Sequence, residues 1–91
     1  MQKVEGQKKD FEVRIFALST CMWCRKTKKL LEENSVEYEF EDVDLLAGEE
    51  REKVLEEVKK YNPGVTFPTT VIDGKTITGF KEDALKEALG L

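Results

Sequence analysis

Histidine is absent from the 91-residue chain, and cysteine and proline are scarce, with two residues of each. Without histidine, one chain cannot build a Cys/His zinc site or a Cys–His nucleophile pair. No apolar run approaches the roughly 18 residues that a membrane helix needs, so we expect no membrane association. The first ten residues lack the apolar segment of a secretory signal, and we therefore expect a cytoplasmic protein.

Composition favours one small soluble domain. Hydrophobic residues make up 40% of the chain and charged residues 37%, and the formal net charge is −4. This negative balance argues against general binding to nucleic acid or to anionic membranes. We expect residues 1–10 to form a flexible polar tail and residues 11–91 to form a single domain that acts as a monomer.

Hydrophobic periodicity predicts seven elements after this tail. An alternating stretch that ends all apolar predicts a central strand, and a helical pattern follows it, with Arg25, Lys26, Lys28 and Lys29 facing largely outward. The predicted strands cover about 11–18, 36–40, 69–72 and 76–78, and the helices cover 21–34, 49–61 and a short stretch that ends at Gly90. The expected fold is an α/β fold of order β-α-β-α-β-β-α, with one mixed four-stranded sheet and helices on both faces.

Both cysteines lie at the first junction between strand and helix, in the segment Thr20-Cys21-Met22-Trp23-Cys24. A helix that starts at Cys21 directs unpaired backbone N–H groups at its sulfur, and Arg25 with Lys26 adds positive charge. Cys24 lies one turn further on the core side, close enough for a disulfide. We therefore expect Cys21 to attack and Cys24 to resolve. The alternative is a pair of inert buried cysteines.

Three further segments are candidate binding residues, each with a plainer interpretation. Met22 and Trp23 form either an apolar rim beside the sulfur or ordinary surface near a helix start. Pro68 either marks the entrance of an edge strand or, beside a Cys-x-x-Cys pair, forms a cis bond that turns the Phe67 backbone toward a partner. The N–H groups after Gly79 either bind a carboxylate or belong to a simple turn.

Taken together, these motifs resemble glutaredoxins over residues 11–90. The resemblance rests on Ile15-Phe16-Ala17-Leu18, the Cys21–Cys24 pair, Thr66-Phe67-Pro68 and Gly79-Phe80. It implies a thioredoxin-like fold, dithiol–disulfide exchange led by Cys21, a cis Pro68, and a peptide or glutathione lying against Phe67. The implied site comprises Cys21 and Cys24 for catalysis and, for substrate binding, Thr20, Met22, Trp23, Thr66, Phe67, Pro68, Gly79, Phe80, Lys81 and Glu82.

Two departures from the glutaredoxin pattern bear on the electron donor. Met22-Trp23 replaces the Pro-Tyr pair of dithiol glutaredoxins, and Gly79-Phe80 before a basic residue is similar to NrdH-redoxins, small reductants of ribonucleotide reductase. Leu18 stands where many glutaredoxins carry Lys or Arg, so one anchor for glutathione is missing. The resemblance then implies no tightly bound cofactor beyond the redox-active disulfide, protein disulfides as substrates, and a thioredoxin reductase or a ferredoxin-linked reductase as a better donor than glutathione.

A metal-binding module is the alternative function. Copper chaperones also place Thr-Cys-x-x-Cys after a strand, and their thiolates bind soft Cu(I). Those domains follow the order β-α-β-β-α-β, whereas this chain is predicted to end in a helix after a hairpin. A dimer that bridges zinc or an iron–sulfur cluster through four thiolates is the other form of this alternative. Redox chemistry remains the favoured hypothesis, with no metal site in a single chain.

Overall fold

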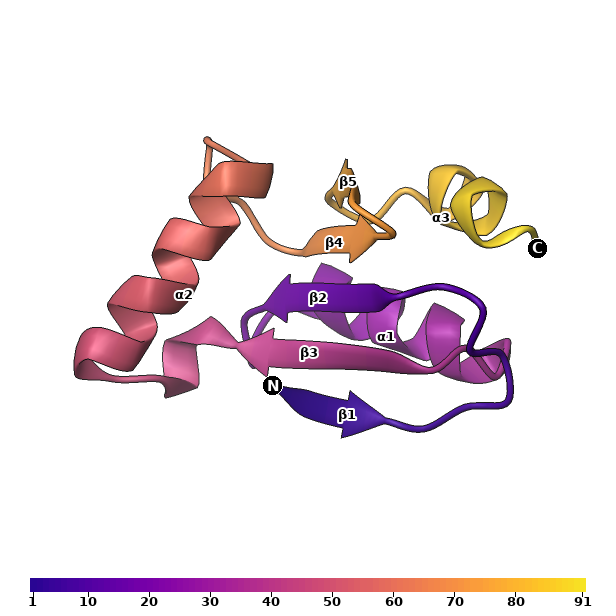
Figure 1. The fold of residues 1–91 in the computed structure, drawn as a ribbon, viewed down its shortest axis with the longest axis horizontal. Helices are drawn as coiled ribbons and strands as arrows, with labels where there is room; N and C mark the ends of the chain where they lie inside the picture. Colours follow the sequence, from indigo (N-terminus) through magenta and orange to yellow (C-terminus); the bar gives the residue numbers. More distant parts are fainter.

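The computed structural model describes all 91 residues (Figure 1). The elements follow in the order β1 (Gln2–Val4), β2 (Val13–Ala17), α1 (Met22–Glu33), β3 (Tyr38–Asp42), a 3₁₀ turn η1 (Val43–Leu45), α2 (Gly48–Tyr61), β4 (Thr69–Ile72), β5 (Lys75–Thr78) and α3 (Glu82–Leu89). None of the helices has the length and apolarity that a membrane crossing requires. The predicted order of helices and strands after the tail is confirmed, with shifts of a few residues at the ends.

The strands form one mixed sheet in the order β1-β3-β2-β4-β5. β2 lies at its centre and pairs in parallel with β3 and antiparallel with β4, as the crossover through α1 requires. β4 and β5 form the predicted hairpin, with Asp73 and Gly74 at positive φ in its turn. Because β2 is central, its carboxyl end lies between the neighbouring strands β3 and β4. The chain continues from this end into the start of α1.

The sheet has five strands, so the prediction of four is wrong. Residues 2–4 were expected to be a frayed tail but form β1, which pairs antiparallel with β3 through Lys3 and Glu39 among others. Two of the three residues of β1 are exposed and polar. An edge strand that buries almost nothing carries no hydrophobic alternation, and its hydrogen bonds depend on the backbone of β3 rather than on its own sequence.

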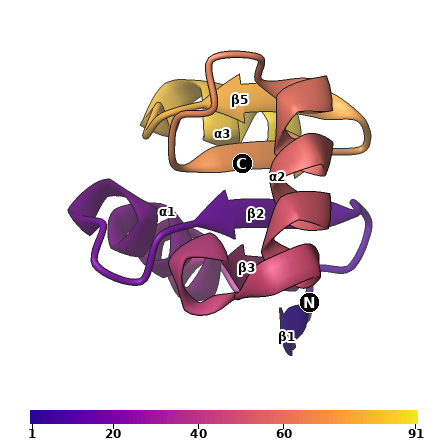
Figure 2. The ribbon, with the colours of Figure 1, turned by 90° about the vertical axis from the view of Figure 1, so that its left-hand side faces the viewer.

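Alternate residues of β2 are buried on opposite faces of the sheet. Val13, Ile15 and Ala17 belong to the core cluster that takes its helical residues from α1 and α3. Phe16 belongs to a second cluster with Val58 of α2. In Figure 2, α2 lies in front of the strands and α3 behind them. This double burial fixes β2 within the molecule and so fixes the point where the chain enters α1.

The N-terminal segment can be tested through Gly6, where an added Cβ would lie 2.6 Å from the Ser35 carbonyl oxygen and 2.7 Å from the Glu37 nitrogen. Both neighbours are backbone atoms, so Gly6→Ala should displace the segment and lower the free energy of unfolding by about 1–3 kcal/mol. The matched control is Gly64→Ala, whose Cβ would lie 3.5 Å from the Asn62 side chain, an ordinary contact. Urea unfolding of both variants measures the difference, and equal stabilities would contradict the docking of residues 2–8 against β3.

Candidate functional site

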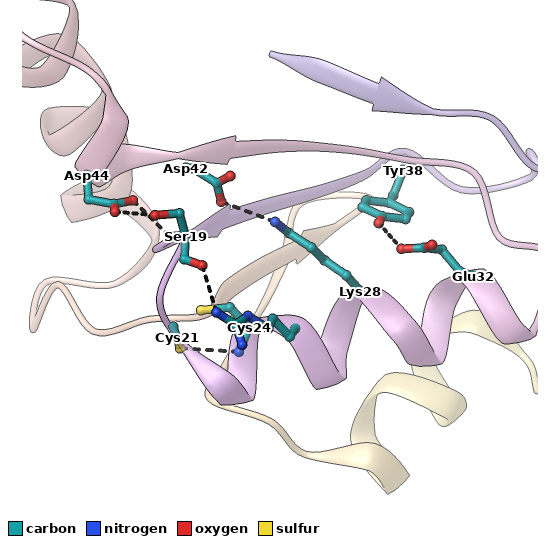
Figure 3. Close-up of polar contacts among 9 residues, drawn as sticks. Ser19, Cys21, Cys24, Lys28, Glu32, Tyr38, Asp42 and Asp44 are labelled. Atoms are coloured by element: carbon teal, nitrogen blue, oxygen red, sulfur yellow. Dashed lines mark hydrogen bonds and ion pairs between the residues drawn. The ribbon is translucent and has the colours of Figure 1, made fainter.

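Cys21 lies at the start of α1, as predicted. It is the N-cap residue, with extended backbone angles, and its Sγ accepts a hydrogen bond from the Cys24 backbone N–H at 3.2 Å (Figure 3). The Cys21 N–H in turn donates to the Leu18 carbonyl at 3.1 Å, which closes the turn between β2 and α1. The side chain is partly exposed. The Cys21 sulfur is therefore the one of the two that a substrate can reach, at the start of the helix.

Cys24 has the opposite environment. Its side chain is 0% exposed and belongs to the main core cluster. Burial, with smaller contributions from the neighbouring Cys21 sulfur, raises the pKa of the Cys24 thiol to about 12, while the Leu18 backbone and the Lys28 ammonium act in the lowering direction. Both cysteines are free thiols in this structure. One turn of helix therefore separates an accessible sulfur from one that burial keeps protonated at neutral pH.

The loop before Cys21 is held by a carboxylate from η1, the turn that directly follows β3. Asp44, in η1, accepts the Ser19 backbone N–H at 2.8 Å and the Ser19 hydroxyl with its other oxygen (Figure 3). These hydrogen bonds hold the pKa of the Asp44 carboxyl below its usual range. The sequence analysis missed both residues, because 24 residues separate them and no local motif connects them.

α1 is also attached to β3 at two points. The Lys28 Nζ lies 3.1 Å from the Asp42 Oδ1 and 4.0 Å from the centre of the Phe40 ring. One turn further, the Tyr38 hydroxyl donates to the Glu32 carboxylate at 2.6 Å. Burial, together with this carboxylate, raises the pKa of the Tyr38 hydroxyl well above its usual range.

The prediction that Lys28 faces outward is therefore wrong, since its side chain is only 18% exposed. A lysine stem is long enough to run from a flank of the helix to the sheet edge and to keep its charge paired. The inward residues of α1 are the predicted ones, namely Cys24, Thr27, Leu30 and Leu31.

The Phe67–Pro68 peptide bond is cis, as predicted. Pro68 is buried, and the loop that carries it is held by the Asn62 side chain. The Asn62 Nδ2 donates to the Thr66 carbonyl at 3.2 Å, to the Thr66 hydroxyl at 2.8 Å and to the Thr69 hydroxyl at 3.0 Å. Thr66 was predicted to bind substrate, but its polar atoms are engaged within the loop. Asn62, which directly follows α2, was not among the residues predicted to form the site.

Strand pairing brings the segments around Pro68 and Gly79 to the end of the sheet where α1 begins. Thr69 pairs with Phe16 of β2 on one side and with Thr78 of β5 on the other. The Gly79 N–H then donates to the Pro68 carbonyl at 2.8 Å. The entrance of β4 and the exit of β5 thus lie beside the end of β2, from which the chain continues into α1.

Aromatic stacking joins this edge to α1. The Trp23 ring packs on the Phe80 ring, with centroids 5.9 Å apart and planes at 22°, and the Lys26 Nζ lies 4.7 Å above the Trp23 ring. Trp23 is nevertheless 49% exposed and Met22 is 56% exposed. The two residues between the cysteines therefore leave a large apolar surface in contact with water.

The remaining predicted binding residues lie on the surface of the protein. Thr20, Lys81 and Glu82 are exposed, and the Glu82 carboxylate lies 3.8 Å from the Lys86 Nζ. The Gly79 N–H is occupied by Pro68, whereas no side chain caps the first turn of α3. Across the chain, no three His, Cys, Asp or Glu side chains converge as metal ligands.

Comparison with known proteins gives consistent matches. The Glutaredoxin family profile matches residues 13–77, more than half of the chain. The crystal structure of a glutaredoxin from Methanosarcina mazei Go1 is 46% identical, with a TM-score of 0.90 over 99% of this chain and 87% of that chain. The structure of Methanosarcina acetivorans methanoredoxin is 45% identical, with a TM-score of 0.89 over 94% of this chain and 90% of that chain.

Among curated relatives, a glutaredoxin-like 8.6 kDa protein from the rubredoxin operon of Clostridium pasteurianum is 33% identical over 70 residues, which cover 77% of this chain and 87% of that protein. A probable maleylacetoacetate isomerase from Caenorhabditis elegans is 38% identical over 60 residues, which cover 66% of this chain. The chain spans only 25% of the length of that isomerase, so the similarity concerns one part of it.

The hydrogen bonds to Asp44 make part of the stability depend on pH. When folding lowers the pKa of a carboxyl, the ionised group stabilises the folded protein. This contribution is complete at pH values above the pKa of the unfolded state, and it is lost as the pH falls through the pKa of the folded state. Asp44→Asn should therefore be less stable than the wild type at neutral pH, and the two should converge in acid. Urea unfolding across this range measures the effect. Glu52→Gln, a charge change on an exposed residue without an ion-pair partner, should show no such convergence. A constant difference for Asp44→Asn at all pH values would contradict the assignment.

Proposed function

Because this chain belongs to the glutaredoxin family, whose members are thiol–disulfide oxidoreductases, we propose that it reduces protein disulfides through Cys21 and Cys24. The observation that supports this most directly is the contrast between the two sulfurs. The Cys21 Sγ is partly exposed and accepts a backbone N–H at 3.2 Å, while Cys24 is completely buried one turn further along. The first arrangement suits a nucleophile that meets a substrate, and the second suits a thiol that reacts only within the protein.

The proposed reaction has two steps. The Cys21 thiolate attacks one sulfur of the substrate disulfide, a mixed disulfide forms, and the other substrate sulfur leaves as a thiolate that takes up a proton. The Cys24 thiol then loses its proton and attacks the Cys21 Sγ. The mixed disulfide breaks, the second substrate thiolate leaves, and the Cys21–Cys24 disulfide remains. The substrate gains two electrons, which a donor must return to the protein.

Exposed residues around Cys21 are the proposed contact surface for the partner. Met22 and Trp23 provide apolar area beside the sulfur, and the Trp23 ring is held by its stacking on Phe80. Aromatic residues and methionine are enriched in protein interfaces, because they bury much area with little loss of conformational freedom. We assign the Phe67 backbone, next to the buried Pro68, as the edge that an extended substrate segment meets. A reducing compartment such as the cytoplasm suits this role.

The division of labour between the cysteines can be tested by substitution. Cys21→Ser should abolish reduction of a protein disulfide, because no other accessible thiol can attack. Cys24→Ser should leave the first step intact and trap a mixed disulfide with the target protein, which non-reducing electrophoresis detects. If Cys24→Ser keeps full activity on protein disulfides while Cys21→Ser traps the target, the proposed roles are reversed.

The nature of the donor follows from the charges near Cys21. Glutathione is an anion, but Leu18 offers no cation on one side of the sulfur, and the first turn of α3 carries Glu82 and Asp83 on the other. We therefore expect slow turnover with glutathione and faster reduction by NADPH with thioredoxin reductase or by ferredoxin with its disulfide reductase. Parallel assays of the oxidised protein with the three donors measure the order.

The expected order of donors can be tested with a variant that adds a positive charge beside the Cys21 sulfur. Leu18→Lys should raise kcat/KM for glutathione by about ten- to a hundredfold, because one charge-assisted contact contributes roughly 1.5–3 kcal/mol. Reduction by the enzyme donors should change little. Fast glutathione-dependent turnover of the wild type, without a response to either reductase, would overturn this expectation.

A further inference from the structure

The resolving step presents a chemical problem for this chain. Cys24 must become a thiolate before it can attack the mixed disulfide on Cys21, yet its side chain is completely buried. Burial disfavours the charged form of a thiol. The chain contains no histidine that could assist as a base. Some other feature of the protein must therefore lower the cost of forming this thiolate.

Lys28 is placed to do so. It follows Cys24 by four residues on α1 and thus lies on the same side of the helix. Side chains on a helix lean toward its N-terminus, so Lys28 extends over the turn that contains Cys24. Its Nζ lies 3.1 Å from the Asp42 Oδ1, and the two side chains are 18% and 13% exposed. Figure 3 shows Lys28 reaching from α1 to Asp42 on the side of the helix where Cys24 lies.

The surroundings of Cys24 offer no competing cation. The core cluster that contains Cys24 takes apolar residues from β2, β4 and α3. The Cys21 sulfur acts against the Cys24 thiolate, whereas the Leu18 backbone and, to a smaller extent, the Lys28 ammonium act in its favour. The neighbouring Arg25 is exposed, and its guanidinium lies 3.5 Å from the Ser19 carbonyl. The side chain that brings positive charge to the buried sulfur is therefore Lys28.

We propose that Lys28, held in place by Asp42, is a positioning residue for the resolving step, where its ammonium group stabilises the Cys24 thiolate. The ion pair with Asp42 and the contact with Phe40 allow a lysine charge to remain in this half-buried position. This proposal rests on the proposed function, because it concerns the second step of that reaction. It assigns no role to Lys28 in the first step.

A symmetric aromatic disulfide that releases a coloured thiolate, dithiobis-nitrobenzoate, separates the two steps. In the first phase the reduced protein attacks through Cys21, forms a mixed disulfide and releases one aromatic thiolate. In the second phase Cys24 gives up its proton to solvent, attacks the Cys21 Sγ and releases the second aromatic thiolate. The protein loses two electrons and the reagent gains them, so the amplitudes count the steps. Stopped-flow absorbance gives a rate for each phase.

Lys28→Gln should leave the first phase unchanged and slow the second about tenfold, which is equivalent to roughly 1.4 kcal/mol of lost thiolate stabilisation. The deficit should be the same at neutral and mildly alkaline pH, because the buried thiol is then almost entirely protonated in both proteins and the thiolate fraction rises in parallel. Lys28→Arg keeps the charge and should retain most of the second-phase rate. Lys28→Met keeps the aliphatic stem over Phe40 and should behave like Lys28→Gln, provided that urea unfolding confirms a folded protein.

Lys29→Gln is the matched control, because it removes the same charge from an exposed neighbour on the outer side of α1. It should alter neither phase. The proposal is overturned if neither Lys28→Gln nor Lys28→Met slows the second phase, if Lys29→Gln slows it equally, or if Lys28→Arg slows it as much as Lys28→Gln. A wild-type protein that releases one aromatic thiolate and then stops would overturn the proposed function itself, which is a distinct result.

Discussion

The junction between β2 and α1 is the constraint on which the rest of the site depends. β2 is buried on both faces, with Ile15 packed toward α1 and α3 and Phe16 packed toward α2. Its end therefore has one position in the molecule, and the turn that follows leads directly into the helix. Cys21 is the N-cap of that helix, and its sulfur receives the Cys24 N–H at 3.2 Å. The position of the Cys21 sulfur is thus set by the packing of a strand that contains no cysteine.

The same junction explains why two identical side chains have different chemistry. Three residues along a helix are about one turn, so the two cysteines are close enough to pair while their surroundings differ. Cys21 remains at the helix start with a backbone donor, whereas Cys24 enters the core, where burial raises the pKa of its thiol to about 12. An accessible thiol and a protected one result from helix geometry together with the direction in which α1 faces the sheet.

Two carboxylates at the end of β3 support this junction from a distance. Asp44 binds Ser19 and so holds the loop that enters the site, while Asp42 pairs with Lys28 and so holds a charge over the turn of Cys24. Both follow from the parallel pairing of β2 with β3, which brings the ends of the two strands to the same edge. The end of β3 and the turn after it thus shape a site to which they contribute no sulfur.

The sequence by itself determined the features that depend on near neighbours. The helical period places Cys24 and Leu31 on the inner face of α1, the Asp73-Gly74 turn indicates the hairpin, and the Cys-x-x-Cys spacing predicts a reactive pair. Only the tertiary structure decided that residues 2–4 form a strand, that Lys28 turns inward, and that Asp44 binds Ser19. Each of these depends on a partner supplied by β3 or the turn after it, and periodicity along one segment carries no information about which distant segment will lie beside it.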